Sequence, residues 1–335
     1  MRLTCAFSTG WLAVVLAASA QPFHLPTANR ALLEKGAEEK FFVGTTGKPW
    51  PSGTFGCVRS EGGQMHEGLD IRCGKRDRKG EPLDPVMASA PGTVAYLNSR
   101  VGTSNYGRYA VLKHLIEGME VFTLYAHLSE FAPGLKTGQA VRAGEVIATM
   151  GRTSNTRERI SQERAHVHFE INLFNSDRFS AWYKKEHPKT PDDHGMWNGM
   201  NLLGLDPRLV FLAEQAPGAS FSLLKFVQSR PELCRVFVRD ASFSFVKRYP
   251  MLLRPNPLAQ KEGIAGYEIA LDFNAVPIQL TPRAASEIKS KVRYQLLSVN
   301  AAEEEKNPCR HLVIRRGQGW ELTNHATTFL DLLTQ

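Results

Sequence analysis

Short stretches in which hydrophobic and polar residues alternate occupy the chain between about residues 51 and 213. They are GTVAYL (92–97), YAVLKHL (109–115), EVFTLYAHL (120–128), AVRAGEVIATMG (140–151) and AHVHFEINLF (165–174). A period of two is typical of strands that bury one face, and the glycine turns between these stretches favour antiparallel connections. The pattern therefore predicts a mainly β fold, with a compact antiparallel sheet domain over residues 51–213.

The segments on either side carry different patterns. Residues 21–50 form a short lead-in, in which TANRALLEKGAEEKFF (27–42) has a helical character. EQAPGAS (214–220) has the composition of a linker, so residues 220–335 are expected to form a C-terminal accessory domain that is β-rich or α+β. Strands are expected there in RVFVRDASFSFV (235–246), GYEIALDF (266–273) and HLVIRRG (311–317), and helices in PRAASEIKSKV (282–292) and at the C-terminus. No chemistry-bearing cluster indicates a function for this part.

The first twenty residues depart from both patterns. Arg2 precedes the apolar run GWLAVVLAA, whose last residue begins the small-residue stretch Ala18, Ser19 and Ala20. This arrangement predicts a secretory signal peptide over residues 1–20 and a location in the periplasm or outside the cell. The apolar run is too short to span a membrane, and no later segment is long enough for a transmembrane helix.

Composition and charge narrow the class of partner. The 335 residues are 42% hydrophobic and 22% charged, which is typical of globular domains, and the formal net charge is +8. For an exported basic protein, the expected anionic partner is a cell-envelope polymer and not nucleic acid.

Export also makes disulfides plausible, and four cysteines follow the signal. We expect the pairs Cys57–Cys73 and Cys234–Cys309, because each would then lie within one proposed domain. A zinc site made of cysteines is disfavoured, because CxxC spacing is absent.

Two histidine motifs stand out from the β pattern. HEGLD places His66 and Asp70 four residues apart, a spacing that suits a metal site, a salt-bridged pair and a solvated turn alike. In HVHFEI (166–171), alternation puts His166, His168 and Glu170 on one face of a strand and the apolar residues between them on the other. Such a strand would hold its imidazoles in a row on the open side of the sheet.

A third histidine lies near the end of EVFTLYAHL. Strict alternation places His127 on the same face as Tyr125 and Thr123, and places Leu124 and Ala126 on the opposite face. Taken alone, His127 is more typical of a hydrogen-bonded strand histidine than of a catalyst. A structural role is also expected for His114, in VLKHL, with support of a ligand through a hydrogen bond as the alternative.

Together, however, the ordered motifs HEGLD, YAHLS (125–129) and HVHFEI resemble the LytM/lysostaphin-type zinc metallopeptidases. The flanking phrases FGCVRSEGG (55–63) and GQAVRAGEVIATMG (138–151) fit the same family. The resemblance runs from about Phe55 to Phe174, and LLGLDPRLVFL (202–212) fits the usual end of the domain. It implies an antiparallel β fold whose groove holds one Zn²⁺, and an activity on peptide bonds in bacterial peptidoglycan.

The resemblance also implies roles for five residues. His66, Asp70 and His168 correspond to the three zinc ligands, whereas His127 and His166 correspond to residues that face the metal-bound water and the substrate. Two imidazoles and one carboxylate would leave an open position on the ion, which is typical of catalytic zinc. Either His166 or His127 is expected to act as the general base, and the other to stabilise the oxyanion or protonate the leaving amine.

Some features lie outside the simplest family pattern. Glu170 either orients His168 through a hydrogen bond or is an exposed strand carboxylate. The charged segment RTSNTRERISQERA (152–165) and the aromatic segment 175–200 are longer than expected, and each either walls the groove or forms a solvated loop.

Three functional hypotheses follow. The favoured one is an exported zinc endopeptidase acting on peptidoglycan stem peptides or cross-bridges. The alternatives are a non-cleaving wall-binding or hydrolase-regulating protein on the same scaffold, and a general secreted protease.

Overall fold

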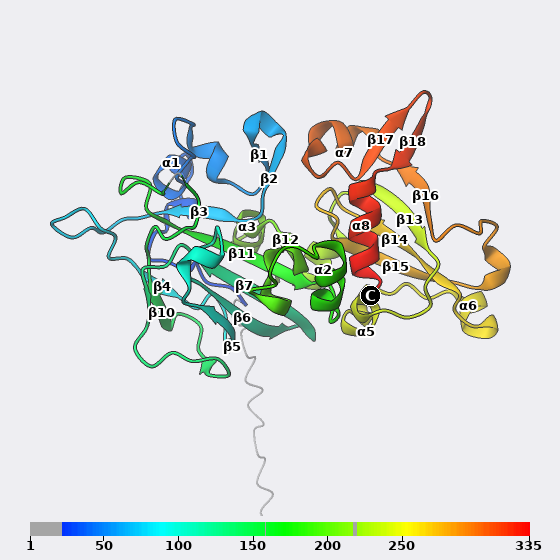
Figure 1. The fold of residues 1–335 in the computed structure, drawn as a ribbon, viewed down its shortest axis with the longest axis horizontal. Coiled ribbons are helices and arrows are strands. Elements are labelled where there is room, and N and C mark those ends of the chain that lie inside the picture. The colour runs from blue at the N-terminus through cyan, green and yellow to red at the C-terminus, as the bar shows by residue number, and fades with distance from the viewer. Residues whose placement is uncertain (1–21, 158, 217–219) are drawn as a thin grey trace, which may run out of the picture.

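An antiparallel β-sheet of seven strands forms the centre of the first half of the chain (Figure 1). The computed structural model describes residues 22–157, 159–216 and 220–335. The sheet order is β12 (Leu202–Leu205), β11 (His166–Phe174), β7 (Met119–Ala126), β6 (Tyr109–Ile116), β5 (Gly92–Asn98) and β9 (Ala140–Val141), with β3 (Leu69–Arg72) also paired to β11. The predicted mainly β, antiparallel fold class is confirmed.

Smaller sheets flank the central one. β4 (Pro85–Met87), β10 (Val146–Thr149) and β8 (Glu130–Phe131) form a three-stranded sheet, and β1 (Gly56–Arg59) and β2 (Gln64–His66) form a hairpin. The predicted signal peptide falls outside the described residues. Within those residues, no helix is both long enough and apolar enough to cross a bilayer.

Strand β11 is buried along its whole length, so the expected open side of the sheet is limited to the end at which His166 and His168 line a groove. One face packs into the main core through residues such as Phe169 and Ile171. The other face is covered by the aromatic segment that follows β11, in which Trp197 packs on Phe122 and Phe174. Part of this segment forms α2 (Phe179–Glu186), and the remainder contains the short 3-10 turns Gly195–Trp197 and Gly199–Asn201.

The lead-in packs against the sheet but is less helical than predicted. It contains a 3-10 turn (Ala31–Leu33), α1 (Glu38–Phe41) and a second 3-10 turn (Trp50–Gly53). Gly36, with a left-handed φ of 78°, separates the first turn from α1, so residues 27–42 do not form one helix. Phe42 is fully buried and forms an isolated bridge with Ile71 of β3.

The second half of the chain contains a four-stranded antiparallel sheet beside the first half (Figure 1). Its order is β15 (Pro277–Arg283), β14 (Gly266–Leu271), β13 (Cys234–Val238) and β16 (Tyr294–Val299), accompanied by the hairpin of β17 (Val313–Arg316) and β18 (Gly319–Leu322). The helices of this half are α4 (Leu223–Gln228), α5 (Ser244–Arg248), α6 (Pro257–Glu262), α7 (Ala301–Lys306) and the C-terminal α8 (Asn324–Leu333). α3 (Pro207–Glu214) belongs to the first half, where Phe211 stacks on Phe169 of β11.

Two sequence predictions for this half need correction. The helix expected over 282–292 is wrong, because β15 continues to Arg283 and only Ala285–Glu287 form a 3-10 turn. The segment 235–246 is a strand only as far as Val238, and its end belongs to α5. The expected C-terminal helix is present as α8.

The predicted disulfide pairing is also wrong. The bond joins Cys57 in β1 to Cys309 near the C-terminus, with their Cα atoms 5.4 Å apart, whereas Cys73 and Cys234 are buried free thiols. The prediction assumed that each disulfide lies within one half of the chain. The β1–β2 hairpin, however, extends to the C-terminal segment, and Cys73 lies beside Asp84. The two halves are therefore covalently linked, and the division into domains at 213–220 remains a prediction.

Candidate metal centre

Three strands bring the motif residues together. Asp70 on β3 lies directly opposite His168 on β11 in the antiparallel register, and such a pair has adjacent side chains. His66 ends β2, and Gly68 lies between it and Asp70. A Cβ atom at Gly68 would lie 2.3 Å from the carbonyl oxygen of Phe169, so the close approach of the two strands requires glycine here.

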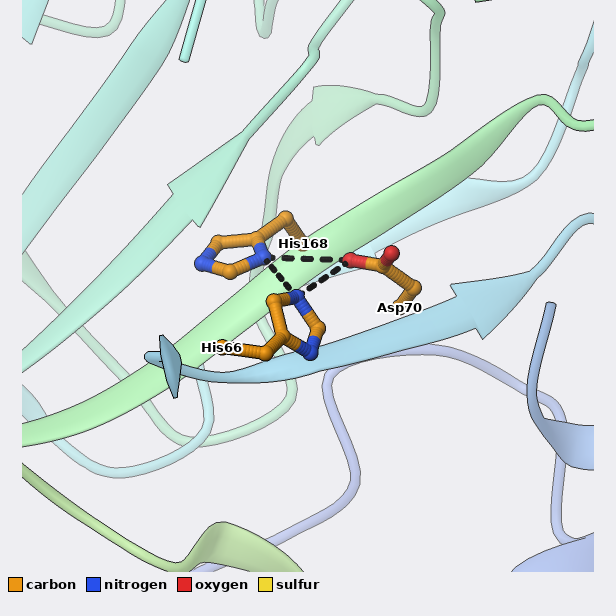
Figure 2. Close-up of side chains that lie close together, drawn as sticks. All are labelled: His66, Asp70 and His168. Carbon is orange, nitrogen blue, oxygen red and sulfur yellow. Dashed lines mark hydrogen bonds and ion pairs between the residues drawn. The ribbon is translucent and has the colours of Figure 1, made fainter. Parts of the chain in front are cut away.

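The three candidate ligand atoms form a small triangle, drawn in Figure 2. His66 Nε2 is 3.1 Å from Asp70 Oδ1 and 3.1 Å from His168 Nδ1, and the latter two atoms are 3.1 Å apart. Ligand atoms about 2.0–2.1 Å from a tetrahedral ion lie about 3.3 Å from each other, so the triangle has nearly the size that zinc requires. All three side chains are buried.

The outer nitrogens of both candidate ligand histidines have fixed partners. His66 Nδ1 lies 2.7 Å from the carbonyl oxygen of Thr54, and His168 Nε2 lies 2.8 Å from Oε1 of Glu170. A carbonyl oxygen and a carboxylate only accept hydrogen bonds, so each outer nitrogen carries the proton. The lone pairs of His66 Nε2 and His168 Nδ1 are thereby directed at the centre of the triangle.

Glu170 is buried and belongs to this network, which excludes the exposed alternative. Its side chain is 1% exposed. Besides its contact with His168, it accepts hydrogen bonds from Tyr106 Oη at 2.7 Å and from Asn172 Nδ2 at 2.9 Å. A carboxylate behind a ligating histidine orients the ring and raises the basicity of the ligand.

His127 and His166 lie beside the triangle. Their rings contact each other, with centroids 4.8 Å apart, and His166 Nε2 is 3.4 Å from Asp70 Oδ1. In both, Nδ1 lies close to a backbone carbonyl oxygen, that of Thr153 for His127 and that of Arg164 for His166. Each Nδ1 therefore donates a proton outward, and each Nε2 is left as an acceptor.

The orientation of His127 departs from strand alternation. Ala126 pairs with His168, so the regular alternation of β7 directs Ala126 to the face of His168 and would direct the next side chain away. The strand ends at Ala126, however, and His127 has a left-handed φ of 61°. This uncommon conformation for a residue other than glycine brings its ring to the site.

The charges around Asp70 favour a cation. Burial opposes its ionisation, but His166 and His66 outweigh burial and hold the pKa of Asp70 well below its usual range. Arg59, from β1, places Nη2 2.5 Å from Asp70 Oδ2, which leaves Oδ1 as the oxygen facing the triangle.

The pKa values of His168 and His127 are shifted in opposite directions. Burial lowers the pKa of His168, yet hydrogen bonds to Asp70 and Glu170 outweigh burial and raise it to about 10. The two carboxylates thus favour a positive charge between them, and a divalent cation would supply it in place of the proton. Burial holds the pKa of His127 well below its usual range, so its imidazole is neutral.

The triangle opens into a groove of about 1750 Å³. The charged segment 152–165 contributes Asn155 and Arg164 to its lining, and the aromatic segment contributes Asn198 and Met200. Both long segments therefore wall the groove. The C-terminal half also contributes residues to the lining of the groove, and Arg310 is one of them.

Several residues of the site were not singled out by the sequence. Arg59 and Tyr106 lie outside the histidine motifs, and their signals are limited to the phrase FGCVRSEGG and an isolated tyrosine in a loop. His114 is buried and bonded to the Pro91 carbonyl and to Thr123, which agrees with its expected structural role.

Comparison with known proteins gives a family match and distant relatives. Residues 64–180 match the model of Peptidase family M23, which confirms the resemblance to LytM/lysostaphin-type peptidases. The cell division protein DipM of Caulobacter vibrioides is 31% identical over 155 residues, which are 44% of this chain and 22% of DipM. A lipoprotein NlpD/LppB homolog of Pseudomonas aeruginosa is 32% identical over 126 residues, 37% of this chain and 35% of that protein.

Among solved structures, the chain is similar to the catalytic domain of the antimicrobial peptidase lysostaphin from Staphylococcus simulans. The two are 26% identical, the TM-score is 0.24, and the match covers 36% of this chain and 74% of that one. The chain spans well under half the length of DipM and of the NlpD/LppB homolog, the two relatives matched by sequence.

Proposed function

We propose, on the premise that residues 64–180 match Peptidase family M23, that the chain is an exported zinc endopeptidase that hydrolyses peptide bonds in bacterial peptidoglycan. The observation that carries the proposal is the convergence of inner histidine nitrogens and one carboxylate oxygen beside an open groove. The family match supports a peptidase related to peptidoglycan, and the signal-like N-terminal sequence supports export to the envelope or beyond.

In this proposal His66 Nε2, Asp70 Oδ1 and His168 Nδ1 would hold one Zn²⁺ per chain. When bound, zinc lowers the pKa of its water and polarises the scissile carbonyl. Asp70 would be held as a one-oxygen ligand by Arg59, which engages its other oxygen. Glu170 would keep the His168 ring in place and make its inner nitrogen a stronger donor to the ion.

His127 and His166 would move the protons. Each has Nδ1 bonded outward to a backbone carbonyl and Nε2 directed into the site, so each can accept one proton at Nε2. One would remove the proton from the attacking water, and the other would bind the developing oxyanion or protonate the leaving amine. The surrounding groove would hold the peptide on both sides of the scissile bond.

Peptide release from labelled peptidoglycan, measured with the chain from residue 21 onward, tests the proposal. We expect release that chelator abolishes and zinc restores, and loss of both zinc and release in His168→Ala. His127→Ala and His166→Ala are expected to keep zinc but to lose release by about 10²-fold or more. His114→Gln is the matched control, because this buried histidine lies outside the groove lining and is expected to retain zinc and activity.

Two other outcomes would replace the proposal. Binding of peptidoglycan without release of peptides, at full zinc occupancy, would indicate a non-cleaving regulatory or wall-binding protein. Cleavage of soluble proteins with intact peptidoglycan left untouched would indicate a general protease.

A further inference from the structure

One wall of the groove comes from the C-terminal half of the chain, far in sequence from the histidine motifs. Asn274, Arg310, His325 and Phe329 line the same groove as His66. The 3-10 turn that carries Arg310 (Pro308–Arg310) is fixed to the first half, because its central residue, Cys309, is bonded to Cys57 of β1. This wall is therefore a fixed part of the candidate site.

The guanidinium of Arg310 is held in one orientation. Its Nε donates to Asn274 Oδ1 at 2.6 Å, and Asn274 Nδ2 donates in turn to the carbonyl oxygen of Gly204 in β12 at 2.7 Å. Asn274 is only 3% exposed, so it is an anchored partner. The side chain of Arg310 remains 26% exposed and lines the groove.

The terminal nitrogens have little else to bind among the described residues. Nη2 lies 3.7 Å from Oε1 of Glu67, a distance that is too long for a hydrogen bond. Glu67 is 41% exposed, and ion pairs of exposed side chains contribute little. Because Glu67 directly follows His66, this contact also places Arg310 next to the hairpin that carries a candidate ligand.

The charged residues that line the groove leave a small positive excess. Its lining contains the basic residues Lys48, Arg59, Arg164 and Arg310, against the acidic residues Glu61, Glu67 and Asp70. A bound divalent cation would make the groove more positive still. A planar guanidinium with parallel N–H donors matches a carboxylate better than a neutral amide.

We propose that Arg310 is a substrate-binding residue that holds a free carboxylate of the peptide substrate, and so makes the C-terminal half part of the specificity of the enzyme. This inference rests on the proposed function in taking the substrate to be a peptide. The disulfide and the Asn274 contact keep the guanidinium in place before the substrate arrives, which reduces the ordering cost of binding.

The test uses the full mature chain and two synthetic stem peptides of identical sequence, one with free carboxylates and one with the same groups as carboxamides. For wild type we expect kcat/KM to be at least about tenfold higher for the carboxylate peptide. Arg310→Gln is expected to remove this preference, mainly through a higher KM, with the amide peptide unaffected. Arg310→Lys is expected to restore part of it, because lysine keeps the charge but lacks the fork.

Arg316→Gln is the matched control, because Arg316 is an exposed arginine of the β17–β18 hairpin outside the groove lining. It is expected to keep the wild-type preference. An equal loss on both peptides in Arg310→Gln would indicate a structural role and overturn the inference. A wild-type enzyme without a preference for the carboxylate peptide would also overturn the inference. The same holds if Arg310→Gln keeps the preference while thermal unfolding shows that the variant is folded.

A second readout separates this inference from the proposed function. The dissociation constants of both peptides are measured by calorimetry on the chelator-treated chain, which needs no turnover. If wild type cleaves neither peptide, the proposed function fails, yet a carboxylate preference in binding that disappears in Arg310→Gln would still support the inference. Equal affinity of wild type for both peptides would overturn it.

Discussion

Replacement of Glu170 by glutamine tests whether the buried carboxylate supports the metal site through His168. Glu170→Gln preserves shape and removes one negative charge 2.8 Å from His168 Nε2. Loss of such a carboxylate behind a ligating histidine typically weakens metal binding about 10–100-fold, or roughly 1.4–2.8 kcal/mol. We expect a loss of that size in zinc affinity.

The substitution also disturbs the hydrogen bond between Glu170 and Asn172. Asn172 Nδ2 donates to Oε2 of Glu170, and a glutamine amide at that position would place two donors against each other. However, Asn172 Oδ1 is buried without a hydrogen-bond partner among the described residues, so rotation of the Asn172 amide would restore the contact. The Nδ2 donor then takes the position in which Oδ1 had no partner, so we expect the metal-free chain to lose up to about 1–3 kcal/mol of stability.

Zinc affinity is measured by competition with a chromophoric chelator, and the stability of the metal-free chain by thermal unfolding. Asp84→Asn is the matched control, because Asp84 is a buried carboxylate that accepts hydrogen bonds from the backbone of Gly74 and Lys75 outside the groove lining. It is expected to leave zinc affinity unchanged. A folded Glu170→Gln chain that binds zinc within twofold of wild type would refute the role given to this carboxylate.

Two further predictions concern the rest of the fold. Replacing Cys57 and Cys309 together by serine opens a link between residues 252 positions apart, and is expected to lower the free energy of unfolding by about 2–5 kcal/mol in denaturant titrations. A reductant should lower the free energy of unfolding of wild type by a similar amount and leave that of the double variant unchanged. If the reductant did not affect wild type, the Cys57–Cys309 disulfide would be contradicted. Burial raises the pKa of Asp272 from 3.8 to about 7, so the folded chain keeps this proton where the unfolded chain loses it. Wild type is then expected to lose at most about 4 kcal/mol of stability from this group as the pH rises from about 4 to 7. The melting temperature of Asp272→Asn minus that of wild type should rise over that pH interval. If this difference does not change with pH, the raised pKa of Asp272 is contradicted.

The convergence of the histidine motifs was predicted from the family resemblance that the ordered motifs carry, because spacing and strand alternation alone left several alternatives open. His66, Asp70 and His168 converge as expected, although their roles remain proposals. Alternation failed at His127, because a left-handed backbone at a strand end depends on the packing of neighbouring segments. It also predicted an open face along all of β11, because the sequence does not show that a later aromatic segment covers the strand at Phe174.

Contacts between the two halves were the part least accessible from the sequence. Cysteine spacing allows several pairings, and the pairing expected within each half was wrong because the β1–β2 hairpin extends to Cys309. Arg310 has no motif of its own, and only the tertiary fold places it in the groove. Long-range partners of this kind depend on how folded units dock, and local periodicity carries no information about docking.

The arrangement of the candidate ligands depends on strand register more than on the ion. A shift of one residue between β3 and β11 would turn Asp70 to the opposite face and place it beside a core residue, so the register is strongly specified. Outward hydrogen bonds to the Thr54 carbonyl and to Glu170 then fix the two imidazole rings. Because strand pairing and hydrogen bonds already position all three ligand atoms, the chain pays the cost of ordering them during folding. Metal binding at this site therefore requires displacement of a proton and little rearrangement of the chain.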